Sequence, residues 1–405
     1  MALSRPHFPL IDAVCRALDD IFERRYYADR VIERVLKENP KMGSRDRALV
    51  AETTYNVVRW WRYLYELAGT EAKTDRPSLL RVLSTYFYVF HGEQFTWQEN
   101  SGMEFKSINR KKEELKQNLA ITQSVPDWMF QMGEAELKEN WIKELSALNK
   151  EADVILRVNT LKTDKEALRH KLAEDGIETI DVAGSIDALQ LKQRKNIFRN
   201  EWFQNGFFEV QDSGSQQIGE FVNPQPGMRV IDACAGAGGK SLHLGAMMKN
   251  KGRLISMDVE ERKLIELRKR SSRAGVNIIE TKLIDSGKVI KRLADSADRV
   301  LLDVPCSGMG TLRRNPDAKW KLNPEFFEKV KALQKEILLN YSQMVKVGGQ
   351  LIYATCSIFP SENELQVEAF LKEKGSSFRL LEQKSLSPAK SGTDGFFMAR
   401  LERIA

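Results

Sequence analysis

The sequence predicts an α/β protein in which a mostly parallel, doubly wound sheet follows a small α/β module and an all-helical N-terminal region. Three patterns predict this class. From residue 216 onward, short apolar runs alternate with amphipathic segments, as in repeated strand–helix–strand units. A glycine-rich turn at 234–240 follows the first of these runs. Residues 1–150 instead place apolar side chains at helical spacing. We therefore expect three regions, 1–150, 151–215 and 216–405.

The N-terminal region, residues 1–150, has mostly helical patterns. Apolar side chains recur at helical spacing over residues 10–22 and 47–64, and their aromatic members are expected to pack in a core. Residues 94–116 are polar and predict a loop or long connection, whereas residues 127–141 predict another helix. Five basic residues could form a surface for RNA, although such charges more often lie on a solvated helix face: Lys41, Arg45, Arg47, Arg59 and Arg62.

Residues 151–215 change to a strand-rich pattern with one helix at 165–173. This is typical of a ferredoxin-like or RRM-like RNA-binding module, and periodicity alone fits a structural linker domain equally well. A basic stretch, Lys192 to Lys195, belongs to it. The expected strands are 153–159, 177–182, 188–193 and 207–211.

The first strand of the C-terminal region, residues 228–231, leads through Asp232 into Cys234-Ala-Gly-Ala-Gly-Gly-Lys240 and a helix at 241–249. A strand, a glycine turn and a helix in this order hold nucleotide-like ligands. The dinucleotide motif is incomplete because Ser241 replaces its third glycine, and a P-loop would need glycine at Cys234. The next strand ends at Asp258, about 20 residues past the turn, where a carboxylate accepts hydrogen bonds from ribose. These features favour a nucleoside cofactor such as S-adenosylmethionine.

Further strands end near Asp285, Asp303 and Cys356, with helices such as 260–274 and 323–345 between strands. Right-handed crossovers would bring all the strand ends to one edge of the sheet. Four carboxylates and two thiols would then lie along a single crevice, because Cys306 closely follows Asp303.

The two thiols, Cys306 and Cys356, each follow the end of an apolar strand. A buried cysteine is usually inert, but two at equivalent positions beside a cofactor crevice favour catalysis. A thiolate that adds to carbon 6 of a pyrimidine makes carbon 5 nucleophilic toward a methyl donor. The reaction also needs a group that stabilises charge near N3 and N4 of the ring, a task that suits Asp303 if it is protonated or hydrogen-bonded there.

The segment 150–405 resembles RNA (cytosine-5)-methyltransferases of the RsmB/Nop/Sun group. The matching stretches are Asp232 to Lys240, Asp303-Val-Pro-Cys-Ser-Gly-Met-Gly310, Ala354-Thr-Cys-Ser357 with Ser361-Glu-Asn-Glu364, and Gly395-Phe-Phe-Met-Ala399. The resemblance implies a Rossmann-like domain that transfers a methyl group from S-adenosylmethionine to carbon 5 of a cytosine in RNA. Ribosomal RNA is the favoured substrate, and transfer RNA is the second choice. The resemblance also implies that Cys356 is the nucleophile and that Cys306 assists its release. The implied cofactor residues are Cys234, Ala235, Gly236, Ala237, Gly238, Gly239, Lys240, Asp258, Arg262, Asp285 and Asp303.

The glycine turn departs from the family, whose loop usually reads Cys-Ala-Ala-Pro-Gly-Gly-Lys. Gly236 and Ala237 replace an alanine and the proline, so the loop loses the restraint that proline places on φ. Both cysteines remain, and we still expect an active enzyme. Residues 1–120 resemble, more weakly, the NusB-like helical domain of the RsmB branch through 43–49 and 55–59, which implies RNA binding.

Two polar stretches carry secondary expectations. In residues 311–320, Arg313, Arg314 and Lys319 could hold phosphates and Trp320 could stack on a base, as readily as the stretch could be a structural loop. Ser361 and Glu364 have the spacing of a capping box at a helix start. A target base inside a duplex would have to be flipped out, or lie in a single strand.

Composition narrows the remaining classes. The 405 residues carry a net charge of +7, a mild excess that permits nucleic acid as a partner. We expect no membrane segment or signal peptide. The four cysteines lack C-x-x-C spacing and the histidines are scattered, so we expect no metal site and a reduced cytoplasmic location. We also expect a monomer. The competing hypotheses are a non-catalytic RNA-binding assembly factor and, less favoured, a P-loop NTPase or an amino-group methyltransferase.

Overall fold

The computed structural model describes residues 5–405. The chain divides into two compact units, which we call the helical unit (Met1–Lys150 with Leu312–Pro324) and the sheet unit (Glu151–Thr311 with Glu325–Ala405). Within residues 5–405, no helix combines the length and the apolar character that crossing a membrane requires.

The helical unit has one aromatic and aliphatic core, to which α1, α3 and α5 each contribute buried side chains. The predicted helix 47–64 is two helices, because Trp60 at φ −106° and ψ 20° interrupts it. The loop expected at 94–116 is present only in part, since the segment also contains η1 and α6, a helix in which Ile108 is the only buried residue. The elements are α1 Phe8–Phe22, α2 Ala28–Glu38, α3 Ser44–Arg59, α4 Trp61–Ala68, α5 Arg76–His91, η1 Gln98–Asn100, α6 Phe105–Leu115, α7 Leu119–Thr122, α8 Asp127–Leu137, η2 Lys138–Asn140, α9 Trp141–Leu148 and α16 Ala318–Lys321.

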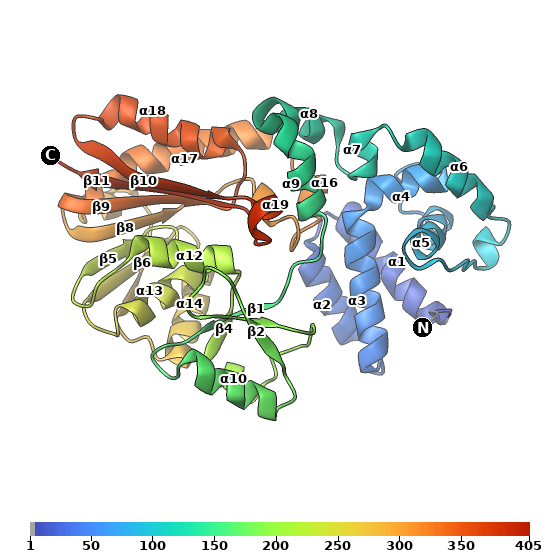
Figure 1. Cartoon of the computed structure of the whole chain (residues 1–405), viewed down its shortest axis with the longest axis horizontal. Coiled ribbons are helices and arrows are strands. Elements are labelled where there is room, and N and C mark those ends of the chain that lie inside the picture. Colours follow the sequence, from blue (N-terminus) through green and yellow to red (C-terminus); the bar gives the residue numbers. More distant parts are fainter. Residues whose placement is uncertain (1–4) are drawn as a thin grey trace. The chain divides into compact units, whose positions relative to one another are not determined.

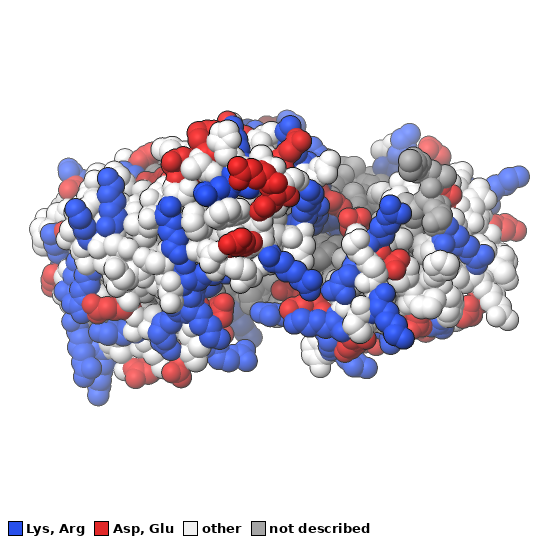
Figure 2. Space-filling model, turned by 90° about the horizontal axis from the view of Figure 1, so that it is seen from below, with Lys and Arg blue, Asp and Glu red and all other residues white. Residues whose placement is uncertain are grey.

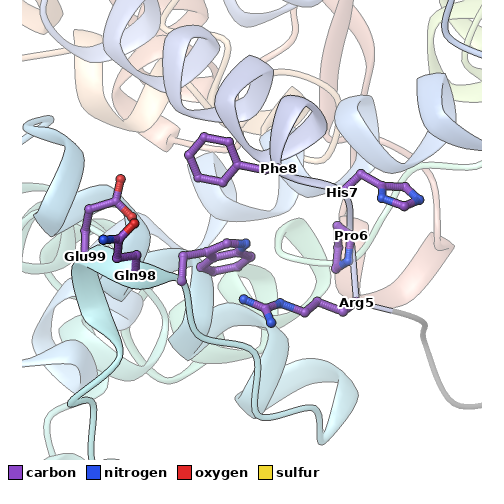
Figure 3. Close-up of a pocket in the computed structure, with 7 residues that line it drawn as sticks. Arg5, Pro6, His7, Phe8, Gln98 and Glu99 are labelled. Atoms are coloured by element: carbon purple, nitrogen blue, oxygen red, sulfur yellow. The ribbon is translucent and has the colours of Figure 1, made fainter.

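A cavity of about 470 Å³ lies in the helical unit, between the start of α1 and η1. Figure 3 shows the side chains of Arg5 to Phe8 on one side and Gln98 and Glu99 on the other. The predicted catalytic and cofactor residues all belong to the sheet unit. This cavity is therefore not the candidate site.

The sheet unit begins with a four-stranded antiparallel sheet of order β2-β3-β1-β4, which we call the small module. Buried side chains of β1 and β3 pack with Leu168 and Leu172 of α10 in its own core. The four strands and the helix expected here are all present. They are β1 Ile155–Val158, α10 Lys165–Glu174, β2 Thr179–Asp181, β3 Ala188–Leu191, α11 Glu201–Gln204 and β4 Phe208–Val210.

The larger sheet has seven strands in the order β10-β11-β9-β8-β5-β6-β7. Strands β9, β8, β5, β6 and β7 are parallel, and β11 and β10 add an antiparallel edge (Figure 1). The elements are α12 Ser213–Val222, β5 Arg229–Asp232, α13 Gly239–Met247, β6 Arg253–Asp258, α14 Glu261–Ala274, β7 Ile279–Leu283, α15 Gly287–Lys291, β8 Ala297–Asp303, η3 Met309–Thr311, α17 Pro324–Tyr341, η4 Ser342–Met344, β9 Val345–Thr355, η5 Pro360–Glu362, α18 Glu364–Lys374, β10 Phe378–Leu386, α19 Pro388–Ser391 and β11 Phe396–Arg403.

Both faces of this sheet are covered by helices. Ile231 and Ile255 point to the face that packs against α17 and α18, while their neighbours Val230 and Leu254 point to the face covered by α12 and α13. This alternation follows from the two-residue period of a strand, and Figure 1 shows the two helical layers. The predicted Rossmann-like, doubly wound sheet is confirmed. The strand order also places the carboxyl end of β8 between those of β5 and β9.

Candidate active site

The glycine loop, residues 233–239, connects β5 to α13. Gly236 and Gly238 have φ of 54° and 87°, in the left-handed region where a glycine avoids the strain of a side chain. A Cβ on Gly238 would lie 2.5 Å from Leu267 of α14, so this glycine also allows close packing. A Cβ on Gly236 or Gly239 would meet no atom within 4 Å. The loop therefore presents open space to a ligand on one side and packs tightly on the other.

Asp258, at the end of β6, holds this loop. Its carboxylate accepts hydrogen bonds of 2.9 Å from the backbone N–H groups of Gly236 and Glu260. The adjacent Val259 is 65% exposed and offers an apolar surface beside the carboxylate. Arg262 and Asp285, both expected to bind cofactor, are exposed. Lys263, which the sequence reasoning missed, pairs with Glu260 at 2.6 Å, and this hydrogen bond, with a smaller effect of the nearby Asp258, raises the pKa of Lys263.

Asp232, at the end of β5, is a buried carboxyl that the sequence placed at the crevice. Its Oδ2 atom accepts a hydrogen bond of 2.7 Å from Ser241, whose hydroxyl accepts one of 2.9 Å from Ser256. Its Oδ1 atom has no hydrogen-bond partner within residues 5–405. Burial raises the pKa of Asp232 from 3.8 to about 7, because water cannot solvate the charged form.

The raised pKa of Asp232 predicts a pH dependence of folding stability. A carboxyl whose pKa is higher in the folded than in the unfolded state stabilises the fold below about pH 4, and this stabilisation is lost as the pH rises to about 7. We expect this group to lower the free energy of unfolding by about 3 kcal/mol between pH 5 and pH 8. Asp232→Asn should remove that part of the slope. Urea unfolding of the wild type and Asp232→Asn at pH 5 and pH 8 measures the free energies of unfolding. An equal change between the two pH values in both proteins would contradict the prediction.

Lys240 and Asp303 form an ion pair beside the loop. The ammonium nitrogen of Lys240 lies 2.6 Å from Oδ2 of Asp303. Burial alone would lower the pKa of Lys240, but the charge and hydrogen bond of Asp303 outweigh it and raise the pKa. Lys240 is therefore a cation at neutral pH. Cys234, in the same loop, has its pKa raised well above the usual value by burial, so it is a neutral thiol there.

The two predicted catalytic thiols are brought together. Strands β8 and β9 are parallel neighbours in which Asp303 pairs with Ala354, so Cys306 and Cys356 leave the same sheet edge side by side. Their sulfur atoms are 3.2 Å apart and both thiols are free. The hydrogen bond with Cys356, followed by burial, raises the pKa of Cys306 well above the usual value. Cys306 thus keeps its proton at neutral pH.

Glu362, fully buried in η5, joins the two cysteine loops. Its Oε1 atom accepts hydrogen bonds from the backbone N–H of Ser307, at 2.8 Å, and from Gln334, at 3.0 Å. Its Oε2 atom accepts from the hydroxyls of Ser307 and Ser357. Ser307 follows Cys306, and Ser357 follows Cys356. One carboxylate therefore fixes the backbone beside both thiols.

The N-cap of α18 is Asn363, two residues after the expected Ser361, and the side chain of Asn363 accepts no capping hydrogen bond. Asn363 is buried and instead accepts a hydrogen bond from Thr355 at 2.5 Å and donates one of 3.0 Å to the carbonyl of Ser357. A helix does start here, with Asn363 as the N-cap of α18, and Glu362 and Asn363 also support the loop of Cys356.

Gly310 and Gly395 close the far side of the Cys356 loop. The N–H of Gly310 donates to the carbonyl of Cys356 at 2.9 Å, and the N–H of Gly395 donates to the carbonyl of Gly310 at 2.8 Å. A Cβ on Gly310 would lie 2.1 Å from the carbonyl oxygen of Gly395. These two glycines are needed because the backbones approach too closely for a side chain.

The residues expected to contact RNA at 311–320 belong, from Leu312, to the helical unit. Lys319 is 1% exposed, and its ammonium donates to the carbonyls of Arg59 and Ser124 and to Asn149 at 2.7–3.0 Å. All three donors are used, so the predicted phosphate contact of Lys319 is wrong. The indole N–H of Trp320 donates to the carbonyl of Val58 at 2.7 Å, which ties this ring to the helical core instead of leaving it for a base.

Arginines expected on an RNA surface also have internal partners. Arg313 is 8% exposed, and its carbonyl accepts a hydrogen bond of 3.0 Å from the buried Arg59. Arg62 donates to the carbonyl of Val125 and pairs with Asp127, both at 2.7 Å. Arg59 and Arg62 thus stabilise the helical unit, while an RNA contact of the half-buried Arg314 stays a prediction.

Known proteins share both the sequence and the fold of this chain. Residues 220–402 match the family model described as 16S rRNA methyltransferase RsmB/F, and residues 125–198 match the model of an RsmF/B-like ferredoxin-like domain. The "Probable ribosomal RNA small subunit methyltransferase B" of Synechocystis is 30% identical over 95% of this chain and 97% of its own length. The "Ribosomal RNA small subunit methyltransferase B" of Pasteurella multocida is 34% identical over 69% of this chain and 65% of its own length. The crystal structure of PH0851 superposes over 100% of both chains with a TM-score of 0.82 at 24% identity.

Proposed function

The chain belongs to the RsmB/F family of rRNA methyltransferases, and on that premise we propose that it methylates carbon 5 of a cytosine in RNA, ribosomal RNA first, with S-adenosylmethionine as the donor. One observation carries the proposal. Two free thiols lie 3.2 Å apart at neighbouring strand ends, in the same edge as the Lys240–Asp303 pair. A pyrimidine carbon needs a covalent nucleophile to react with a methyl donor, whereas an amino group does not.

Cys356 is the proposed nucleophile. Its thiolate forms a bond to carbon 6 of the cytosine, and the electron pair of the carbon 5–carbon 6 double bond is then available at carbon 5. Carbon 5 takes the methyl group and then passes its proton to a water molecule, and the electron pair of that carbon–hydrogen bond restores the carbon 5–carbon 6 double bond as the sulfur–carbon 6 bond breaks. Cys306 keeps its proton at neutral pH because of Cys356 and burial. It is therefore placed to supply a proton to the departing thiolate or to hydrogen-bond it.

Asp303 is proposed to bind the cytosine ring. Its Oδ2 atom is held by Lys240 at 2.6 Å, which leaves Oδ1 to accept a hydrogen bond from the exocyclic amino group of the base. The fixed charge of this pair stabilises charge that develops near N3 and N4 when the thiolate adds. Asp303 therefore acts on the substrate rather than on the cofactor alone.

The glycine loop and the end of β6 fit S-adenosylmethionine, whose sulfonium supplies an electrophilic methyl group when bound. The open space at Gly236 and Gly239 lets an adenosine-containing ligand approach the backbone. Asp258 is the proposed partner of the ribose hydroxyls, and the exposed Val259 the surface for the adenine ring. Arg262 and Asp285 remain proposed supporting contacts.

RNA is the proposed macromolecular partner of this enzyme. Figure 2 shows runs of Lys and Arg side chains on the face of the sheet unit seen at the left of the view. Exposed residues of this kind on α14 include Arg262, Arg268 and Lys269. Such charges attract the phosphate backbone without reading sequence. Family membership favours this reading over an NTPase, and the intact thiol pair favours it over a non-catalytic factor.

Purified protein is expected to transfer labelled methyl groups from S-adenosylmethionine to an unmodified 16S rRNA transcript. Bisulfite sequencing of the product should show a cytosine newly protected from deamination, because a methyl group at carbon 5 slows that reaction. The matched control is Cys15→Ala, which removes a buried thiol of the helical unit and should leave the transfer intact. Absence of transfer to the transcript and to cellular RNA, or methylation at another atom, would contradict the proposal.

A further inference from the structure

The small module is joined tightly to the end of α14. Gly206, before β4, approaches this helix so closely that a Cβ would lie 2.1 Å from the carbonyl oxygen of Arg273. The amide of Asn159 donates 2.7 Å hydrogen bonds to the carbonyls of Gly206 and Ala274. Lys162 donates to the carbonyls of Asn205 and Arg273, also at 2.7 Å. The joint is polar, but its groups are paired.

Glu209, in β4, is the charged centre of this joint. It is 4% exposed, and its carboxylate pairs with Arg270, at 2.9 Å, and with Arg273, both on α14. It also opposes the effect of burial on Arg157 of β1, whose pKa is lowered to about 10. Arg157 is therefore still a cation at neutral pH. A buried carboxylate is costly unless it is paired, and here two ion pairs and a neighbouring cation compensate it.

Two of these arginines also reach the glycine loop. The Nη1 atom of Arg270 donates to the carbonyl of Ala237 at 2.9 Å, and the Nη1 atom of Arg157 donates to the carbonyl of Gly239 at 2.5 Å. The loop itself has glycines at positive φ at positions 236 and 238 and no proline. The loop lacks the restraint of a proline, and its N–H groups bond to Asp258 and within the loop, while the two guanidinium groups bond the carbonyls of Ala237 and Gly239.

We propose that Glu209 is a positioning residue for the cofactor site: it holds Arg270 by an ion pair and places its charge opposite Arg157 on the neighbouring strand, so that both guanidinium groups stay against the carbonyls of the glycine loop and cofactor affinity depends on the small module. The inference rests on the proposed function and assigns that module a part in it besides any contact with RNA. Arg273 pairs with Glu209, yet its side chain packs over the ring of Phe203 at 4.1 Å and forms no hydrogen bond with the loop among the described residues.

Arg270→Lys and Arg273→Lys form a matched test. Both side chains are 22% exposed, lie one turn apart on α14 and pair with Glu209. A lysine keeps the charge but lacks the fork that bonds two acceptors at once. Calorimetric titration of the full chain with S-adenosylmethionine should give a Kd raised about tenfold for Arg270→Lys and unchanged for Arg273→Lys. In the methyl-transfer assay, Arg270→Lys should raise KM for S-adenosylmethionine by a similar factor and keep kcat at saturation.

Glu209→Gln should raise the same Kd at least as much, and Glu280→Gln, which removes the exposed pair with Arg253, should not. If Glu209→Gln fails to fold, the comparison of Arg270→Lys with Arg273→Lys still tests the inference. Equal affinity of the wild type and Arg270→Lys would overturn the inference alone. A wild-type chain that binds no S-adenosylmethionine would overturn the proposed function and the inference with it.

Discussion

Cys356→Ala is expected to abolish methyl transfer to RNA, with kcat reduced by about 10⁴-fold or more. The thiolate of Cys356 forms the only covalent bond to the base in the proposed mechanism, and without it carbon 5 is not activated. The neighbouring Cys306 lies 3.2 Å away, and although the variant removes the hydrogen bond with Cys356, burial still raises the pKa of the Cys306 thiol. It is therefore a poor substitute. Transfer of tritiated methyl groups to the 16S rRNA transcript measures the loss.

The matched variant Cys306→Ala separates the two thiols. It keeps the nucleophile and removes the group proposed to assist its release, so a covalent protein–RNA complex should accumulate and be seen on a denaturing gel. Cys356→Ala should give no such complex. Loss of the nucleophile is expected to lower kcat by far more than about 100-fold. If Cys356→Ala retained more than about 1% of the wild-type kcat, another group would have to attack the ring.

Glu362→Gln is expected to lower kcat by about 100-fold, because a displacement of about 1 Å at a reacting group has an effect of this size. The carboxylate accepts hydrogen bonds from Ser307, Ser357 and Gln334. A glutamine carries no charge, and its amino group would face N–H donors at the Oε1 position or require both serine hydroxyls to reverse and accept at the Oε2 position. Either orientation weakens the bonds that fix the two serines, and the adjacent cysteines with them.

In Glu362→Gln, an effect on the position of the thiols can be distinguished from an effect on cofactor binding by comparing kcat with KM for S-adenosylmethionine. Glu362 does not contact the glycine loop among the described residues, so KM for S-adenosylmethionine should stay within about twofold while kcat falls. Glu364→Gln is the control, since it changes a neighbouring half-buried carboxylate that accepts a hydrogen bond only from Ser385 in the described structure. Equal kcat for Glu362→Gln and the wild type would contradict the positioning role.

Local patterns were sufficient for most of the sheet unit. The β6 strand and the α14 helix lie where apolar spacing predicts them, at Arg253–Asp258 and Glu261–Ala274. The expectation that strand ends share one edge also held, because right-handed crossovers leave little choice of topology. That Cys306 and Cys356 touch depends further on β8 and β9 being neighbours, and no pattern in the sequence determines that order.

Residues that act through distant partners escaped the sequence reasoning. Glu362 sits in a stretch whose spacing also fits a capping box, and its real partners, Ser307 and Gln334, lie 55 and 28 residues away. Lys319 lies in a polar stretch and would be expected on the surface, but it is buried and bonded to residues that are 170 to 260 positions distant in sequence. A lysine with all three donors bonded inside the protein is recognisable only from tertiary structure.

The most direct test of the proposed chemistry uses 16S rRNA in which cytosine is replaced by 5-fluorocytosine. Fluorine replaces the hydrogen that must leave carbon 5 as a proton before the sulfur–carbon 6 bond can break. The ring should therefore stay bonded to the protein after methyl transfer. With S-adenosylmethionine present, the wild type should form a complex that resists denaturation, and peptide mapping should place the modified base on Cys356. A complex mapped to Cys306, or wild-type protein that methylates ordinary RNA but forms no complex with the fluorinated RNA, would contradict the account.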